Sequence, residues 1–164
     1  MKKILFSLLI FTMIIFSIKA EEVNHSSGEG LVIYKVEMDA DEAIQLLKAN
    51  LEAQQILIID VTNPAAPLSN NSKIFKDFDK LGVDFIQNFL VTSMTTLYKL
   101  FTTDPNAMVL SPWVISVYQY EDDDYTYIVR TKSHILLKGT KHKAVEEAVK
   151  ELESRIDQAI QDML

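Results

Sequence analysis

The sequence contains no cysteine among its 164 residues. A disulfide framework, a thiolate zinc site, a cysteine nucleophile and c-type haem attachment are therefore excluded, and the hydrophobic core alone must stabilise the fold. Glycine is also scarce, with four residues, and none of them forms a glycine-rich phosphate-binding loop. The serines show no nucleophile-elbow motif, so no machinery for hydrolysis is visible. We therefore expect a protein that is not an enzyme and that carries no cofactor.

Histidine is also rare, and His25, His134 and His142 are too far apart in the sequence to show the spacing of metal ligands. The acidic run at 121–124 could hold calcium through its carboxylate oxygens. Its spacing, however, lacks the alternating ligands and the glycine of an EF-hand loop. An acidic run of this kind is more often a solvated turn that discourages pairing at a sheet edge. We predict no metal site.

The N-terminus has the pattern of a secretory signal peptide. Lys2 and Lys3 give a positive start, an apolar run follows at 4–18, and Ala20 offers a small residue for cleavage. The alternative is a retained membrane anchor, although the run is shorter than the roughly 20 residues that a spanning helix needs. The predicted boundaries are a signal peptide at 1–20 that is cleaved after Ala20, a polar leader at 21–30 and a single domain at 31–164.

The mature chain is distinctly acidic, because removal of residues 1–20 takes away three lysines and changes the formal charge from −7 to −10. Nucleic acids and anionic lipids bind basic surfaces. We therefore expect no nucleic acid partner and, after signal cleavage, no membrane partner. The expected location is the periplasm of a bacterium or the medium outside it. A mature chain of about 144 residues can bury roughly two thirds of its unfolded surface, so a stable core is feasible.

Apolar periodicity predicts the first half of the domain. A β-branched run predicts a strand at 31–36, and Asp39 is placed to cap a helix at 40–54. The continuous apolar run at 56–59 is typical of a strand that is covered on both sides. A loop is expected at 63–71, a short helix at 73–80 and a third strand at 83–89. The apolar face expected for the first helix consists of Ala40, Ala43, Ile44, Leu47 and Leu51.

Two further helices are predicted. The first is capped by Thr92 or Ser93 and ends at Asp104-Pro105. The second begins near Thr140 and runs for about 22 residues, or roughly 33 Å, so part of its apolar stripe overhangs a strand of about 20 Å unless loops cover it. Residues 131–137 either continue a strand or form a separate edge piece. The apolar faces are expected to contain Met94, Leu97, Tyr98 and Phe101 in the first helix, and Val145, Ala148, Val149, Leu152, Ile156, Ala159, Ile160 and Met163 in the second.

The charged face of the last helix is expected to lie in solvent. Glu146 with Lys150, and Glu151 with Arg155, have the spacing of ion pairs on one helix. Both pairs indicate the side of the helix that faces away from the core.

The stretch at 112–130 predicts a hairpin at the centre of the sheet, since two β-branched and aromatic runs surround the acidic break. Pairing of Tyr120 with Tyr125 would place Tyr118 opposite Tyr127 on one face. The same register places Ser116 opposite Val129 on that face, and Val117 opposite Ile128 and Ile115 opposite Arg130 on the other. One face would thus be rich in tyrosine and the other mostly aliphatic.

The tyrosines are the candidate ligand-binding residues. An aromatic surface can stack a ring-containing or apolar ligand while its hydroxyls make polar contacts. The same rings could instead be cross-strand pairs that stabilise the sheet, or could lie beneath the helices. Trp113 is either a core residue or an anchor at the rim. The candidate residues are Tyr118, Tyr120, Tyr125, Tyr127, Tyr34 and Trp113.

The predicted element order indicates an α+β fold, a two-layer sandwich with a mixed sheet and helices packed on one face. The segments FIQNF at 85–89, LYKLF at 97–101, Asp104-Pro105 and PWVISVYQY at 112–120 resemble a bacterial family catalogued only as domain of unknown function 302. The resemblance implies a compact α+β fold and no established activity. Many members carry cysteine where this chain has Trp113, and often another where it has Phe89, so a thiol or metal role there does not carry over.

Two functional hypotheses follow. The first is an exported binding domain that takes a small apolar ligand or an envelope protein on its tyrosine-rich sheet face. The second is a structural or interaction subunit that forms a homodimer, or docks on an envelope protein, through the long C-terminal helix.

Overall fold

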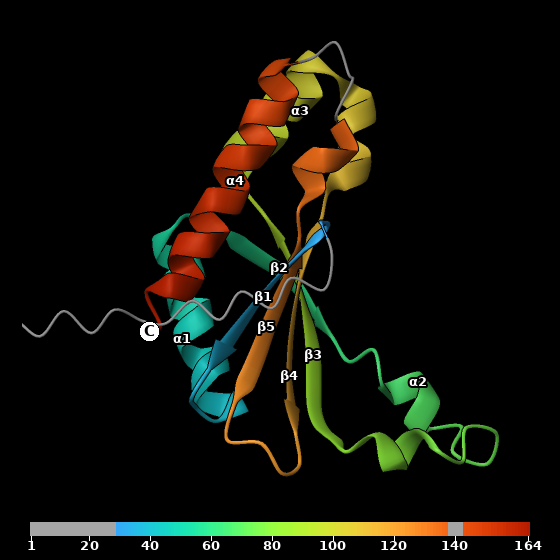
Figure 1. The fold of residues 1–164 in the computed structure, drawn as a ribbon. Coiled ribbons are helices and arrows are strands. Elements are labelled where there is room, and N and C mark those ends of the chain that lie inside the picture. Colours follow the sequence, from blue (N-terminus) through green and yellow to red (C-terminus); the bar gives the residue numbers. More distant parts are fainter. Residues whose placement is uncertain (1–28, 138–142) are drawn as a thin grey trace, which may run out of the picture.

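The structure, a computed structural model, describes residues 29–137 and 143–164, except for the side chain of Asp79. The predicted signal peptide and most of the leader, at 1–28, lie outside the described residues, as do residues 138–142 (Figure 1). The start expected for the last helix, Thr140, therefore falls outside them as well.

One antiparallel sheet forms the centre of the domain, with the strand order β1-β5-β4-β3-β2. The α+β class is confirmed, but the prediction of a mixed sheet is wrong because all four pairings are antiparallel. The outer strands β1 and β2 do run in the same direction, as the strand-helix-strand order suggests, yet three strands lie between them. The strands are β1 (Leu31–Val36), β2 (Leu57–Thr62), β3 (Val83–Thr92), β4 (Trp113–Tyr120) and β5 (Thr126–Thr131).

Helices α1 and α4 lie against one face of this sheet (Figure 1). The Asp39 side chain caps α1 and accepts hydrogen bonds from the backbone N–H groups of Asp41 and Glu42 at 2.8 and 3.4 Å. The α-helices are α1 (Ala40–Ala53), α2 (Ala66–Ser69), α3 (Met94–Thr103) and α4 (Lys143–Gln161), and the 3-10 segments are η1 (Phe78–Leu81), η2 (Pro105–Leu110) and η3 (Ser133–Leu137).

The core lies between α1, α4 and the inner face of the sheet. The side chains of Phe89, Ile115, Val117 and Ile128 are fully buried there. Every residue predicted for the apolar faces of α1 and α4 is also buried, so both predictions are confirmed. The stripe of α4 is buried along its whole length from Val145 to Met163, and part of its cover comes from α1, α3 and η3, which pack against the helix.

The hairpin register is the predicted one. Tyr118 pairs with Tyr127, Ser116 with Val129, Val117 with Ile128 and Ile115 with Arg130. Strand β4 is also the middle strand of five, as expected for the organising element.

Strand β2 differs from its prediction as a strand covered on both sides. It is an edge strand, and Leu57, Ile59 and Val61 are 48, 55 and 39 % exposed. The loop expected at 63–71 contains the single turn α2, and the helix expected at 73–80 is reduced to η1. An apolar run indicates burial only where neighbouring elements exist to cover it.

Helix α3 ends at the predicted Asp104 but packs with a different face. Thr96 and Leu100 are its buried residues, whereas Met94, Tyr98 and Phe101 are 66, 72 and 65 % exposed. The helix lies against α4 beside η2 rather than over the sheet (Figure 1), so only a narrow face is covered.

Two predictions for the C-terminal third are corrected. Residues 133–137 form η3 and extend no strand. Glu151 pairs with Lys99 of α3 at 2.7 Å, not with Arg155, whose guanidinium donates to the Gln54 carbonyl and the Ser93 hydroxyl. The other predicted pair, Glu146 with Lys150, forms at 2.7 Å.

Candidate functional site

Three tyrosines of the hairpin lie on the side of the sheet that faces away from α1 and α4. Val117 on β4 and Ile128 on β5 are buried beneath the helices. Tyr118, Tyr120 and Tyr127 alternate with such residues along the two strands, so their rings point to the opposite face. Tyr120 is 41 % exposed, and the other two rings are half-buried.

The three rings contact one another. Tyr118 and Tyr127 are stacked, with centroids 4.9 Å apart and planes 8° from parallel. Tyr120 meets both edge to face, at 5.6 Å from Tyr118 and 6.0 Å from Tyr127. Offset stacking and edge-to-face contact are the arrangements that aromatic quadrupoles favour. The hairpin therefore builds a preformed aromatic cluster, and no ligand is needed to assemble it.

Tyr125 extends this cluster toward the edge strand β1. The Lys35 ammonium lies over the Tyr125 ring, 3.6 Å from its centroid, and 5.6 Å from the centroid of Tyr127. Lys35 is paired with Tyr127 across β1 and β5, which fixes this proximity. We use the term tyrosine face for Tyr118, Tyr120, Tyr125 and Tyr127.

Asp123 fixes the end of the tyrosine face. Its carboxylate accepts a hydrogen bond from the Tyr127 hydroxyl at 2.7 Å and one from the backbone N–H of Tyr125 at 3.2 Å. Its carbonyl accepts from the Gln119 side chain at 3.1 Å. The tip of the hairpin is thus tied to both strands, and Tyr127 is held in place by its hydroxyl as well as by stacking.

These contacts raise the pKa values of two phenols. The hydrogen bond to Asp123, with burial, raises the pKa of Tyr127 to about 12. Burial raises the pKa of Tyr118. Both groups stay protonated at neutral pH, so the face offers ring surfaces and neutral hydroxyls and is poorly suited to general-base chemistry.

Two of the predicted site residues lie elsewhere, Tyr34 and Trp113. Tyr34 pairs with Ile128, shares its side of the sheet and is 5 % exposed. Its hydroxyl donates to Asp157 of α4 at 2.6 Å. Trp113 is 3 % exposed in the core. The structure therefore joins the four hairpin tyrosines and separates Tyr34 and Trp113 from them.

A buried polar cluster that the sequence patterns did not predict lies on the helix side of the sheet. Arg130 of β5 donates to both carboxylate oxygens of Asp157 and lies 3.8 Å from Glu153. Glu153 in turn accepts hydrogen bonds from the His134 ring at 2.5 Å and from the His134 backbone N–H at 2.9 Å. Burial opposes the charge of Arg130, but Asp157 and Glu153 outweigh burial and raise its pKa. The cluster ties α4 to β5, β1 and η3, and we assign it a structural role.

The sequence did contain a signal for this cluster. Glu153 and Asp157 are four residues apart on α4, and Glu153 lies within the stripe that Leu152 and Ile156 define. Arg130 was predicted to face the aliphatic side, opposite Ile115. A cation and an acid that both point into an apolar layer indicate a buried ion pair.

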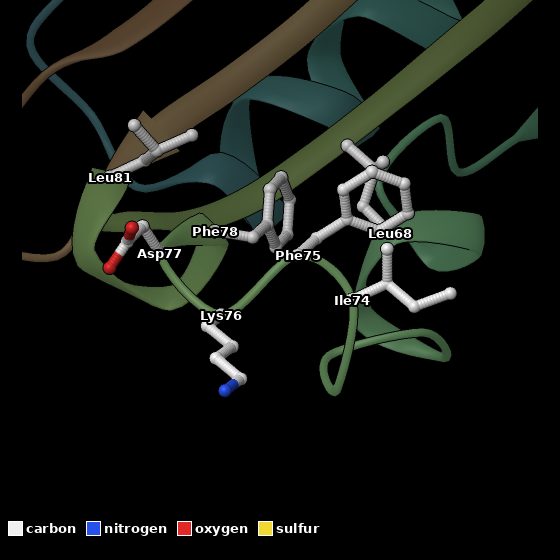
Figure 2. Close-up of a pocket in the computed structure, with 7 residues that line it drawn as sticks. All are labelled: Leu68, Ile74, Phe75, Lys76, Asp77, Phe78 and Leu81. Carbon is white, nitrogen blue, oxygen red and sulfur yellow. The ribbon is translucent and has the colours of Figure 1, made fainter.

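Two of the hollows in the described part of the chain lie away from the tyrosine face. One, of about 300 Å³, lies in the segment between β2 and β3, where Figure 2 shows Lys76 extending away from the rings of Phe75 and Phe78. The other, of about 370 Å³, lies between α3 and α4, and its charged lining residues are Lys99, Glu147 and Glu151. Neither contains a buried titratable group, so we assign no chemistry to them.

Within residues 29–137 and 143–164, no three His, Asp or Glu side chains come together as a metal site. Among the same residues, no helix combines the length and the apolarity that crossing a membrane requires.

The model of the family described as "Domain of unknown function DUF302" matches residues 32–163. The chain belongs to the DUF302 family. The resemblance drawn from the segments between 85 and 120 is thereby confirmed, and the match covers the described sheet except Leu31, together with α1 and α4. No curated protein matches this DUF302 chain.

A solved structure supports the fold of this DUF302 domain. The crystal structure of an uncharacterized conserved DUF302 protein from Bacillus stearothermophilus superposes with a TM-score of 0.66. The alignment covers 83 % of this chain and 98 % of that one, at 16 % sequence identity. At this identity the likeness concerns the fold alone.

Proposed function

We propose that this DUF302 domain is a non-enzymatic binding protein that takes a small ligand on its tyrosine face. The observation that carries the proposal is the contact of Tyr118, Tyr120 and Tyr127 on the sheet face opposite the helices. A cluster needed only for sheet stability would gain from being covered, yet Tyr120 remains 41 % exposed. Aromatic rings with neutral hydroxyls are typical of ligand sites.

The protonation state of Tyr127 favours binding over catalysis. The Tyr127 hydroxyl already donates a hydrogen bond to Asp123, and the pKa of this phenol is about 12. A phenol in this state neither accepts nor releases a proton readily at neutral pH. The tyrosine face therefore supplies contact area and orientation.

A fragment screen followed by NMR chemical-shift mapping tests the proposal. We expect fragments to shift resonances of β4 and β5 around the tyrosine face in the mature chain. The variant Tyr118→Ala/Tyr127→Ala should keep the fold and lose these shifts, whereas the control Tyr98→Ala, which removes an exposed tyrosine of α3, should keep them. Fragments that bind equally well to the double variant, or that never map to this face, would refute the proposal.

We also propose that the domain is exported and that its signal peptide is cleaved after Ala20. The support is the basic and apolar pattern of residues 1–20. Mass spectrometry of the full-length chain expressed in a bacterium should find a mature protein that begins at Glu21. A product that retains residues 1–20 in the membrane fraction would favour the anchor instead.

The alternative function is an interaction subunit. The apolar stripe of α4 is buried within the domain, so α4 offers no apolar surface for a partner. Helix α3 exposes Met94, Tyr98 and Phe101 on one side and is the better candidate. Light scattering of the native chain and of Phe101→Asp tests it, because only an α3-mediated dimer would dissociate in that variant.

A further inference from the structure

The tyrosine face already holds one cation, which belongs to the chain itself. Lys35 Nζ lies 3.6 Å from the centroid of Tyr125 and 5.6 Å from that of Tyr127. An ammonium within about 6 Å of an aromatic centroid is attracted by the negative ring face, and methylated ammonium ions are the ligands that aromatic cages recognise. The geometry of the site is therefore one that stabilises positive charge.

The charges around the face have the complementary sign. Residues 121–124, which connect β4 to β5 beside the rings, are all acidic. Asp123 is engaged by Tyr127 and Tyr125, whereas Glu121, Asp122 and Asp124 are exposed. Among the residues that the structure describes, Lys35 is the cation that lies over the rings of Tyr125 and Tyr127. An anionic ligand would be repelled here, and a neutral apolar ligand would gain nothing from the acids.

We propose that the tyrosine face binds a small organic ammonium ion, and that Lys35 is a built-in occupant which this ligand displaces. The inference rests on the proposed function and specifies its ligand class. A quaternary ammonium fits best, because its methyl groups pack on rings while its charge meets the ring faces and the acidic tip.

Lys35 is suited to being displaced. It lies on the edge strand β1, is only half-buried, and carries its charge on a flexible four-carbon stem. Its ammonium can move into water at little cost, since that group is strongly hydrated. While it occupies the rings, it lowers the apparent affinity for an external cation by the fraction of sites that it fills.

Titration with choline and with its neutral isostere 3,3-dimethyl-1-butanol tests the inference. The proteins are the native mature chain, Lys35→Met, Lys35→Met/Tyr127→Ala and the control Lys132→Met, whose half-buried lysine follows β5 near the far end of β1. Calorimetry and NMR report affinity and location, and thermal unfolding reports that each variant is folded. Phosphatidylcholine vesicles, as a separate arm, distinguish a lipid headgroup from a free ammonium ion.

We expect choline to bind Lys35→Met about twofold to thirtyfold more tightly than the native chain, the range that one cation–π contact spans. The isostere should bind at least about tenfold more weakly than choline. The added substitution Tyr127→Ala should abolish the gain in choline affinity that Lys35→Met produces. Lys132→Met should bind choline as the native chain does.

Three results would overturn the inference. Equal binding of choline and the isostere on the face would refute the ligand class and leave the proposed function standing. Failure of choline to bind Lys35→Met, while fragments still map to the tyrosine face, would also refute the ligand class and leave the proposed function standing. If neither choline nor any fragment reaches this face, the inference and the proposed function fail together.

Discussion

Tyr118 and Tyr127 stack across the hairpin, with ring centroids 4.9 Å apart and planes 8° from parallel. The backbone register makes them direct cross-strand partners, and they lie on the opposite side of the sheet from the buried Val117 and Ile128. The pair therefore contributes to sheet stability and forms part of a preformed recognition surface.

A double-mutant cycle separates the stacking energy from simple burial. Tyr118→Ala, Tyr127→Ala and the double variant should show a coupling of about 0.5–1.5 kcal/mol in the free energy of unfolding. Urea denaturation measures it. A coupling below about 0.3 kcal/mol would mean that the rings are adjacent without interacting.

Alkaline pH should destabilise the domain through Tyr127. Its folded-state pKa is about 12, above the ordinary value of 10.0, so folding favours the protonated phenol. The resulting stability is fully present below about pH 10 and is lost as the pH rises through about 12. An absorbance titration of tyrosinate should show a phenol that ionises late. Asp123→Asn should move that step toward 10, whereas Asp122→Asn, at the exposed tip, should leave it unchanged.

The buried Arg130 cluster should be costly to break. Arg130→Met leaves Glu153 and Asp157 without their cation, and the Arg130 and Glu153 side chains are only 7 and 6 % exposed. We expect a loss of about 3 kcal/mol in the free energy of unfolding, at the lower end for buried pairs because Asp157 is 27 % exposed. Denaturation of Lys80→Met is the control, since the Lys80–Asp77 pair is 77 and 82 % exposed and should contribute under about 0.5 kcal/mol.

Neighbouring residues of α3 should respond in opposite ways. Leu100 is 0 % exposed, so Leu100→Ala should cost about 2–5 kcal/mol of stability. Phe101 is 65 % exposed, so Phe101→Ala should cost under about 0.5 kcal/mol. Denaturation of both variants checks which face of α3 is packed. A larger loss of stability for Phe101→Ala than for Leu100→Ala would show that α3 packs with the face that the sequence predicts.

Local periodicity was sufficient to predict features that depend on a single helix or hairpin. The register of Tyr118 with Tyr127 follows from alternation along an extended chain and from the short acidic turn. The apolar stripe of α4 could also be predicted, because its apolar residues between Val145 and Met163 repeat at helical spacing. All the residues of that stripe are buried. The tyrosine cluster could therefore be predicted from the sequence.

Features that depend on neighbouring elements could not be predicted. The side on which Tyr34 lies is fixed only by its pairing with Ile128, and the exposure of Ile59 only by the edge position of β2. Helix α3 carries apolar residues on two sides, and its contact with α4 selects Leu100 over Phe101. Lys35 reaches Tyr125 because β1 pairs with β5, a contact between segments far apart in the chain.

Hydroxyl-radical footprinting of the full-length chain tests most directly whether the tyrosine face is open. We predict that Tyr120 is oxidised fastest among the residues compared, that Tyr118 and Tyr127 follow, and that Tyr34 and Trp113 are protected, in line with exposures of 41, 5 and 3 % for Tyr120, Tyr34 and Trp113. Protection of Tyr118, Tyr120 and Tyr127 to the level of Tyr34 would show that this face is covered and would contradict its role as a binding surface.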